Sequence, residues 1–300
     1  MELNRLTAND RDLFNKFLAL NTHELSAYAF ENIYIWKGLF DIFFKVIGDS
    51  LCIFFRDKAG GLFMNLPPLA KTTERGVAEE AFVIMDSVNK NKEVSRTENV
   101  EGKDAIFYKG LGHPCIEKPC EYLYNRTELA QLKGDRFKSK RHGFNYFIER
   151  NEFEYQPFSS GHKEGCLLLY DSWIKNRQLK GDDYIYQSML KDSRACFGVL
   201  LNDFEDLGFV GRVVMVNKEI KAFTFGFGLN KETFCIMYEI TDLSIKGLSQ
   251  FIFRQFCGEL KGYSYINVMD DSGLENLKRV KLSYRPIRLI PCYTVKRKAG

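Results

Sequence analysis

Long apolar runs are missing from this chain of 300 residues. The longest stretch without Asp, Glu, Lys or Arg extends from Ala59 to Ala70, well short of the ~20 apolar residues that a membrane-spanning helix needs. The first residues, Met1 to Asp12, contain no apolar segment of the kind found in signal peptides. We therefore expect a cytosolic protein with no transmembrane segment.

Histidine is scarce, and the excess of positive charge is small. The four histidines leave few candidates for a histidine-based catalytic triad, and no Walker loop or EF-hand is present. The formal net charge of +4 indicates no partner unless the positive residues cluster. The segment with His113, Cys115 and Cys120 could supply three metal ligands, but no second Cys/His pair follows at zinc spacing. We therefore predict no metal site.

The chain contains a series of predicted helices and strands that occurs twice in the same order. Apolar periodicity predicts helices, a three-strand antiparallel meander and a further helix in each half. The predictions for the first half are a helix that follows a cap at Thr7 and includes residues 13–18, a helix at 26–36, strands at 40–47, 51–55 and 62–66, and a helix at 74–91. Those for the second half are helices at 165–176 and 182–201, strands at 209–216, 220–229 and 233–240, a helix at 247–260, a strand at 265–268, a helix at 273–280 and a strand at 289–295. This layout predicts an α+β protein with two similar domains, residues 1–150 and 151–300, each a mostly antiparallel sheet flanked by helices.

Positive charge clusters in two segments. The first lies on a predicted helix and contains Lys133, Arg136, Lys138, Lys140 and Arg141; the second is the C-terminal stretch 278–298. Such a run can be a solvated helix face or a binding site for the phosphates of a nucleic acid or a lipid. Both interpretations stay open from the sequence alone.

Three sequence motifs resemble those of a known family. They are the segment LSAYAFENIYIW at 25–36, the segment LKG at 132–134 with FKSKR at 137–141, and KLSYRP at 281–286. They resemble a largely uncharacterised bacterial family related to the C-terminal domain of phosphatidylglycerol lysyltransferase. The order of elements resembles the GNAT acyltransferase fold, and its duplication resembles the Fem aminoacyl transferases. The resemblance implies two tandem GNAT-like domains and a transferase that moves an aminoacyl group from aminoacyl-tRNA to an amine or a hydroxyl, without a bound cofactor.

The same resemblance implies a substrate site in the second domain. Lys281 takes the place of a lysine that lies beside a phosphate-bearing substrate in these transferases, so it could clamp a phosphate or stabilise an oxyanion. Tyr284 would line the pocket, and Asn267, Asp270 and Asp271 would bind substrate. The two aspartates precede a predicted helix and could equally cap it.

Glu239 ends the third strand of the second meander and is the candidate general base. Alternatively, it pairs with a neighbouring Lys or Arg and holds the strand end in place. Family members often carry polar or charged residues where this chain has Met237, Ile240, Val268 and Met269, and these apolar side chains can neither move protons nor hold anions. The alternative function is therefore a catalytically inactive module that uses the basic stretch to hold tRNA or anionic lipid head groups.

The donor is expected to be aminoacyl-tRNA rather than acyl-CoA. An acyl-CoA-dependent GNAT binds pyrophosphate on a loop with the pattern Gln/Arg-x-x-Gly-x-Gly/Ala at a helix N-terminus. The corresponding segment 240–248 keeps only one glycine, Gly247. The sequence leaves the amino acid, the acceptor and the oligomeric state open.

Overall fold

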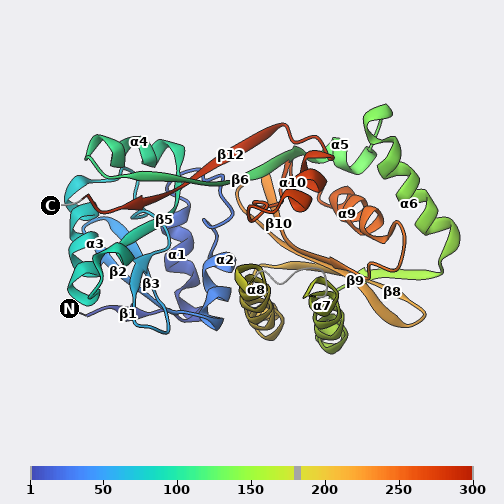
Figure 1. Cartoon of the computed structure of the whole chain (residues 1–300), viewed down its shortest axis with the longest axis horizontal. Coiled ribbons are helices and arrows are strands. Elements are labelled where there is room, and N and C mark those ends of the chain that lie inside the picture. Colours follow the sequence, from blue (N-terminus) through green and yellow to red (C-terminus); the bar gives the residue numbers. More distant parts are fainter. Residues whose placement is uncertain (1, 179–183, 299–300) are drawn as a thin grey trace. The chain divides into compact units, whose positions relative to one another are not determined.

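The computed structural model describes residues 2–178 and 184–298, which form two compact units (Figure 1). Unit 1 contains the chain up to Glu121, the short segment Asp270–Gly273 and the C-terminal segment from Leu289. Unit 2 contains Tyr122–Met269 and Leu274–Arg288. The sequence suggested a division at residues 150 and 151, whereas the chain first passes from unit 1 to unit 2 at Glu121.

Unit 1 is built on a mostly antiparallel sheet with helices packed against it. Its strands pair in the order β1-β2-β3-β4-β5-β12, in which β4 and β5 are parallel. The strands are β1 (Asn4–Arg5), β2 (Asp41–Ile47), β3 (Ser50–Arg56), β4 (Leu62–Met64), β5 (Arg96–Glu101) and β12 (Arg288–Lys296). The helices are α1 (Arg11–Leu18), α2 (Phe30–Ile35), α3 (Arg75–Val88) and α4 (Gly102–Gly110). The meander predicted from the first half is confirmed as β2, β3 and β4.

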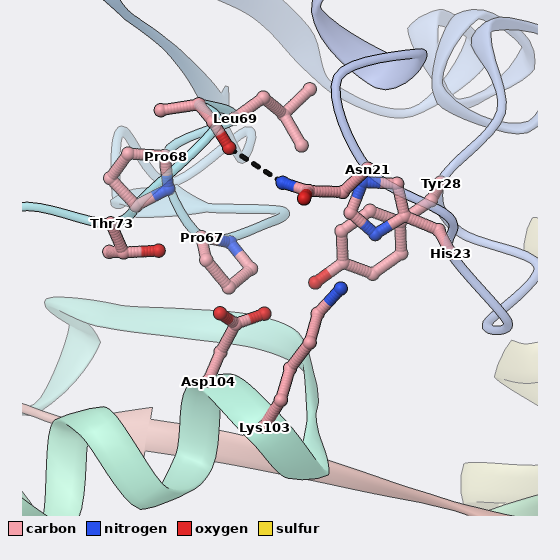
Figure 2. A pocket seen from close by; sticks show the side chains of 10 residues that line it. Asn21, His23, Tyr28, Pro67, Pro68, Leu69, Thr73, Lys103 and Asp104 are labelled. Atoms are coloured by element: carbon pink, nitrogen blue, oxygen red, sulfur yellow. Dashed lines mark hydrogen bonds between the residues drawn. The ribbon is translucent and has the colours of Figure 1, made fainter.

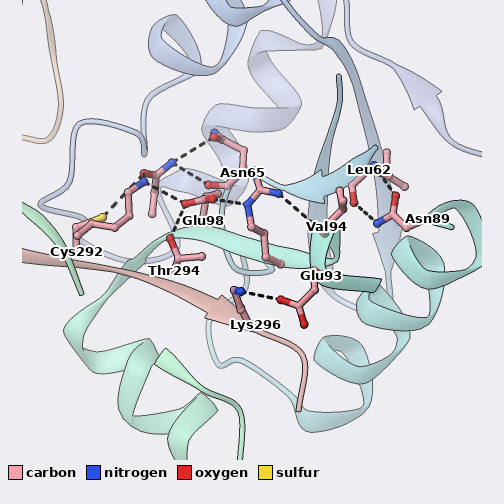
Figure 3. Close-up of polar contacts among 12 residues, drawn as sticks. Leu62, Asn65, Asn89, Glu93, Val94, Glu98, Cys292, Thr294 and Lys296 are labelled. Atoms are coloured by element: carbon pink, nitrogen blue, oxygen red, sulfur yellow. Dashed lines mark hydrogen bonds and ion pairs between the residues drawn. The ribbon is translucent and has the colours of Figure 1, made fainter. Parts of the chain in front are cut away.

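Strand β5 was not predicted, because its sequence RTENVE lacks an apolar alternation. Its charged side chains are accommodated by a polar network (Figure 3). Glu98 accepts hydrogen bonds from Arg96 Nε (2.6 Å), Thr294 Oγ1 (2.7 Å) and Lys118 Nζ (3.1 Å). Burial alone would raise the pKa of Glu98, but Lys118, Thr294 and Arg96 together lower it. Partners from distant parts of the chain thus stabilise a strand that local sequence does not reveal.

Unit 2 repeats this plan. Its strands pair in the order β7-β8-β9-β10-β11, followed by the end of β6, and β10 and β11 are parallel. The strands are β6 (Cys115–Asn125), β7 (Phe153–Pro157), β8 (Val210–Val216), β9 (Glu219–Gly228), β10 (Thr233–Thr241) and β11 (Tyr265–Asn267). The helices are α5 (Arg126–Gln131), α6 (Lys138–Arg150), α7 (Lys163–Gln178), α8 (Tyr184–Asn202), α9 (Leu248–Glu259) and α10 (Glu275–Leu282). The predicted meander is confirmed as β8, β9 and β10, and the fold is α+β as expected.

Strands β6 and β12 pair with strands that are distant in the sequence, and for this reason the two units do not divide at residues 150 and 151. Strand β6 follows α4 in the chain, yet its end pairs with β11, with Tyr124 opposite Ile266. Strand β12 follows α10, yet it pairs with β5, with Cys292 opposite Glu101. Sequence analysis missed β6, in which Pro119 and charged residues interrupt the apolar pattern.

The predicted helices agree with the structure to within a few residues. The expected start of one helix at Asp182 lies outside the described residues, and α8 is described from Tyr184. Helix α10 begins at Glu275 rather than Gly273, because Gly273 has a φ of +71° and Leu274 is extended. Over the described ranges, no helix is both long enough and apolar enough to span a membrane.

Candidate functional site

A β-bulge in β10 determines which face of the unit 2 sheet Glu239 occupies. The register with β9 shifts between Ile236 and Tyr238. Ile236 belongs to the core cluster formed with α9, whereas the ring of Tyr238 lies 5.0 Å from that of Phe197 in α8. In a regular strand these two side chains would share a face, so the extra residue at the bulge reverses the alternation. As the next residue after Tyr238, Glu239 therefore projects from the α9 face.

Glu239 is a carboxylate without a compensating partner in this part of unit 2. The residue keeps only partial exposure, and its Oε2 atom is shielded from solvent and has no hydrogen-bond partner among the described residues. Burial raises the pKa of Glu239 to about 8. The ion pair with a neighbouring Lys or Arg that the sequence left open as an alternative is not formed within the described residues. Such a group can hold or release a proton near neutral pH.

Thr224 in β9 lies directly opposite Glu239. Its side chain is fully buried, and its Oγ1 atom has no hydrogen-bond partner in the described part of the chain. Register partners in antiparallel strands project from the same face, so two uncompensated polar groups lie side by side beneath α9. Buried polar groups of this kind are uncommon and cost free energy unless a ligand or water satisfies them.

Tyr284 and Lys140 belong to the same region of unit 2. The ring of Tyr284 packs edge-on against Phe253 of α9 at 4.8 Å, and Lys140 Nζ lies 4.1 Å from the centre of the Tyr284 ring. Burial is the main reason that the pKa of Tyr284 is raised, and the Glu239 carboxylate adds to this effect. Burial also lowers the pKa of Lys140. Glu239, Tyr284 and Lys140, which sequence analysis placed in three different roles, are thus brought into one neighbourhood.

Lys281 makes a structural contact at the end of β11. Its Nζ atom donates to the carbonyl oxygens of Val268 (2.6 Å) and Met269 (3.1 Å) and lies 5.5 Å from the centre of the Tyr122 ring. The apolar residues Val268 and Met269 therefore contribute backbone carbonyls here. The proposed role of Lys281 as a phosphate clamp stays a prediction.

Asn267, Asp270 and Asp271 form hydrogen bonds within the segment between β11 and α10. Asn267 is fully buried, and its Oδ1 atom accepts from the backbone N–H of Met269 (2.7 Å). Asp270 Oδ1 accepts from Ser272 N (2.6 Å), and Asp271 Oδ1 accepts from Gly273 N (2.9 Å). These bonds stabilise turns before α10, whose N-cap is Leu274. Their predicted role in substrate binding stays a prediction.

The basic stretch predicted on a helix lies at the α5–α6 connection and along α6. Lys133 and Lys138 are exposed, whereas Arg136 pairs with Glu128 of α5. Arg141 donates to the carbonyl oxygens of Leu132 and Gly134, the latter at 2.6 Å. The stretch therefore combines exposed lysines with arginines that hold the connection in place.

The end of the second basic segment, from Leu289 on, and the possible metal ligands belong to unit 1. Three cations at the C-terminus pair with acids: Lys296 with Glu93, Arg297 with Asp86 and Lys298 with Glu79. His113 is buried, and its ring stacks on Phe82 at 4.8 Å. Cys115 and Cys120 are five residues apart on β6 and so belong to opposite faces of that strand. Across the described ranges, the His, Cys, Asp and Glu side chains assemble no group that could hold a metal ion.

Sequence reasoning missed Thr224 and the placement of Lys140. Thr224 is a single polar residue in an otherwise apolar strand, AFTFGFG at 222–228, which is the signal that could have identified it. The shared face with Glu239 depends on the bulge in β10, and no residue type in that strand indicates a bulge.

The chain is similar in sequence or structure to several known proteins. The sequence model described as "Phosphatidylglycerol lysyltransferase, C-terminal" matches residues 19–296. A crystal structure of a conserved protein of unknown function from Bacteroides thetaiotaomicron is 28% identical, with a TM-score of 0.87 over 99% of this chain and 100% of that chain. The structure of L-PGS from Bacillus licheniformis is 16% identical, with a TM-score of 0.66 over 97% of this chain and 93% of that chain. A tandem GNAT protein from the clavulanic acid biosynthesis pathway has a TM-score of 0.55 at 9% identity, covering 100% of this chain and 99% of that chain.

These likenesses confirm the predicted fold of two tandem GNAT-like domains. A curated relative of a different kind, 1-deoxy-D-xylulose-5-phosphate synthase of Clostridium botulinum (strain Alaska E43 / Type E3), is 29% identical over 109 residues. That match spans 36% of this chain and only 16% of the relative's length. The family match, in contrast, spans nearly the whole chain. The chain belongs to the family of the phosphatidylglycerol lysyltransferase C-terminal domain.

Proposed function

We propose that this protein transfers an aminoacyl group from aminoacyl-tRNA to an amine or hydroxyl acceptor, with Glu239 as the proton acceptor. Membership of the lysyltransferase family supports the reaction class. The observation that carries the proposal is the shielded, unpartnered Oε2 atom of Glu239, because a general base must have a free acceptor atom and a pKa near the working pH.

In the proposed reaction, the nucleophile attacks the ester carbonyl of the aminoacyl-tRNA. A new C–N or C–O bond forms, and the ester C–O bond to the terminal ribose of the tRNA breaks. Glu239 takes the proton from the attacking group and returns it to the leaving ribose hydroxyl. Thr224 Oγ1 lies on the same face and would orient the Glu239 carboxyl or the acceptor through a hydrogen bond.

The packing at the start of α9 supports aminoacyl-tRNA over acyl-CoA as the donor. Gly247 is the N-cap of α9 and has a φ of +87°. A Cβ atom at Gly247 would collide with the carbonyl oxygen of Gly143 in α6. The backbone of α6 therefore lies against the helix N-terminus where an acyl-CoA-dependent GNAT holds pyrophosphate.

The exposed Lys133 and Lys138 support binding of the phosphates of the donor tRNA. The same lysines could serve a module that binds tRNA or anionic lipid head groups without catalysing transfer. That second candidate predicts salt-sensitive binding of tRNA or of anionic vesicles with no transfer.

The test is a transfer assay with labelled lysyl-tRNA and two acceptors, phosphatidylglycerol for a hydroxyl and a primary amine for an amine. The wild-type protein should transfer label to one of them, and Glu239→Gln should reduce the rate by roughly 100-fold or more. The matched control is Glu232→Gln, an exposed glutamate in the same β9–β10 hairpin, which should transfer at the wild-type rate. Salt-sensitive tRNA binding without any transfer would replace the proposed enzyme with the binding module.

A further inference from the structure

Two arginines of unit 2, Arg141 in α6 and Arg254 in α9, form no ion pair with an acid among the described residues. The pocket of unit 1 shows the more usual arrangement of a cation (Figure 2). Lys103 lines that pocket beside Asp104, and its Nζ atom lies 3.1 Å from Glu101 Oε2. Arg141 and Arg254, in contrast, carry positive charge that no carboxylate of the described chain compensates.

Both arginines are held against the C-terminal end of α5. Arg254 Nε donates to the carbonyl oxygen of Ala130 (2.9 Å), and the guanidinium lies 4.0 Å from the centre of the Phe144 ring. Arg141 comes three residues before Phe144 on α6, and its Nη1 atom donates to backbone carbonyls just after α5. Residues three apart lie on one face of a helix, so the two guanidinium groups converge on the same place.

The two guanidinium groups are close enough to repel each other. Burial lowers the pKa of Arg254, and the charge of Arg141 lowers it further. The carbonyls at the end of α5 offset this repulsion only in part, because a helix C-terminus carries at most about half a negative charge. An anion that contacts both groups would relieve the repulsion and gain attraction from each of them.

Each arginine keeps donors that the protein does not use. Arg254 Nη1 and Nη2 and Arg141 Nε and Nη2 have no hydrogen-bond partner among the described residues. None of these four nitrogens is shielded from solvent. Arg126, at the start of α5, differs because its Nε, Nη1 and Nη2 atoms all donate to protein oxygens. Arg141 and Arg254 therefore keep accessible donors for a ligand as well as their structural contacts.

The chemistry around the two arginines suits a nucleic-acid backbone. A guanidinium presents its N–H groups in a planar fork that matches two oxygens of a phosphate. The exposed Lys133 and Lys138 lie in the same segment and extend the positive charge beyond a single phosphate. The apolar side chains of that segment, Leu132 and Phe137, are buried, so none is available to enter a bilayer. These features favour RNA over a lipid surface.

We propose that Arg254 and Arg141 together bind one phosphate of the donor tRNA backbone through the donors that the protein leaves unused. The proposal rests on the proposed function for the identity of the RNA. It adds Arg254, which lies outside the basic stretch, and it gives Arg141 a ligand contact in addition to its contact with the end of α5.

The test is filter binding of the full chain with uncharged tRNA, over a series of salt concentrations. Arg254→Gln should weaken binding by roughly 10-fold to 100-fold at low salt and lower the slope of log affinity against log salt concentration by about 1. Arg254→Lys keeps the charge but not the fork, so the slope should stay at the wild-type value while the affinity falls by roughly 3-fold to 10-fold. Arg75→Gln, at an exposed position of α3 in unit 1, is the matched control and should bind as the wild type does.

Unchanged binding in Arg254→Gln, or an equal loss in Arg75→Gln, would overturn the proposal. Near-ultraviolet circular dichroism should be the same for wild type and both Arg254 variants, which separates loss of binding from loss of folding. If Arg254→Gln reduces binding to phosphatidylglycerol vesicles and not to tRNA, the assignment to RNA is wrong. Glu239→Gln should bind uncharged tRNA as the wild type does. A chain that binds tRNA through Arg254 but transfers nothing would therefore refute the proposed enzyme and support this site.

Discussion

Replacing Glu239 by glutamine should stabilise unit 2, and the gain should grow with pH. The pKa of this carboxyl is about 8 in the folded protein, against an ordinary value of 4.5. Below pH 4.5 the folded and unfolded states both hold the proton. As the pH rises from 4.5 to 8, the unfolded chain releases the proton and the folded protein retains it. The wild type therefore loses stability across this window.

The size of the effect follows from the two pKa values. Each pKa unit corresponds to about 1.4 kcal/mol, so the difference between 4.5 and about 8 corresponds to at most about 5 kcal/mol. The glutamine side chain has a similar shape but does not titrate, so its free energy of unfolding does not fall with pH for this reason. The stability gained by Glu239→Gln should therefore increase by several kcal/mol from pH 4.5 to pH 9.

The assay is urea unfolding followed by the fluorescence of Trp173, which lies in α7 of unit 2. The other tryptophan, Trp36, belongs to unit 1, and a Trp36→Phe background leaves Trp173 as the reporter for unit 2. Free energies of unfolding are compared at pH 5, 7 and 9. Glu232→Gln, at an exposed position in the same hairpin, should change none of them by more than about 0.5 kcal/mol.

A difference between wild type and Glu239→Gln that is the same at all three pH values would refute this reasoning. It would mean that the carboxyl finds a compensating partner in solution. The alternative interpretation of Glu239 as one member of an ion pair predicts the opposite sign, namely loss of stability in the glutamine variant as the pH rises.

Three further predictions concern unit 2. Gly247→Ala should destabilise unit 2 by more than about 2 kcal/mol in the same unfolding assay, because Gly247 has a positive φ and the added Cβ would collide with Gly143. The control is Gly258→Ala in α9, where the added Cβ would meet open space. This variant should be neutral or stabilising by up to about 1 kcal/mol. Lys281→Met should cost about 1–3 kcal/mol, because the carbonyls of Val268 and Met269 lose the hydrogen bonds from Lys281 Nζ, although the Met269 carbonyl keeps the one from the backbone N–H of Tyr122. The exposed Lys278→Met should cost less than about 0.5 kcal/mol. Lys138→Ala should lower the slope of log affinity against log salt concentration for tRNA by about 1 in filter binding, and Lys58→Ala in unit 1 should leave that slope unchanged.

Local sequence patterns predicted the two meanders because their strands are apolar and separated by turn residues. Strands β2 to β4 and β8 to β10 each pair with neighbours in the chain, so periodicity and turn chemistry contain the necessary information. Strands β5, β6 and β12 pair with segments far away in the sequence. The sequence revealed β12 through its apolar residues. Strand β5 depends on Thr294 and Lys118, which bond Glu98, and the end of β6 depends on pairing with β11. No local pattern indicates those contacts.

The candidate site could be predicted one residue at a time but not as an arrangement. Glu239 was identified from its place at a strand end. Its burial, its lack of a partner and its position opposite Thr224 depend on the bulge in β10 and on the packing of α9. Lys140 was counted with the basic helix face, although its ammonium lies over the Tyr284 ring.

The most direct test of the central claim is the single-turnover rate of aminoacyl transfer from lysyl-tRNA, measured from pH 6 to pH 9. A base with a pKa of about 8 predicts that the wild-type rate rises with pH and levels off above pH 8, and that Glu239→Gln is slower by roughly 100-fold or more at the plateau. A Glu239→Gln variant that transfers at the wild-type rate with the same pH profile would contradict the account.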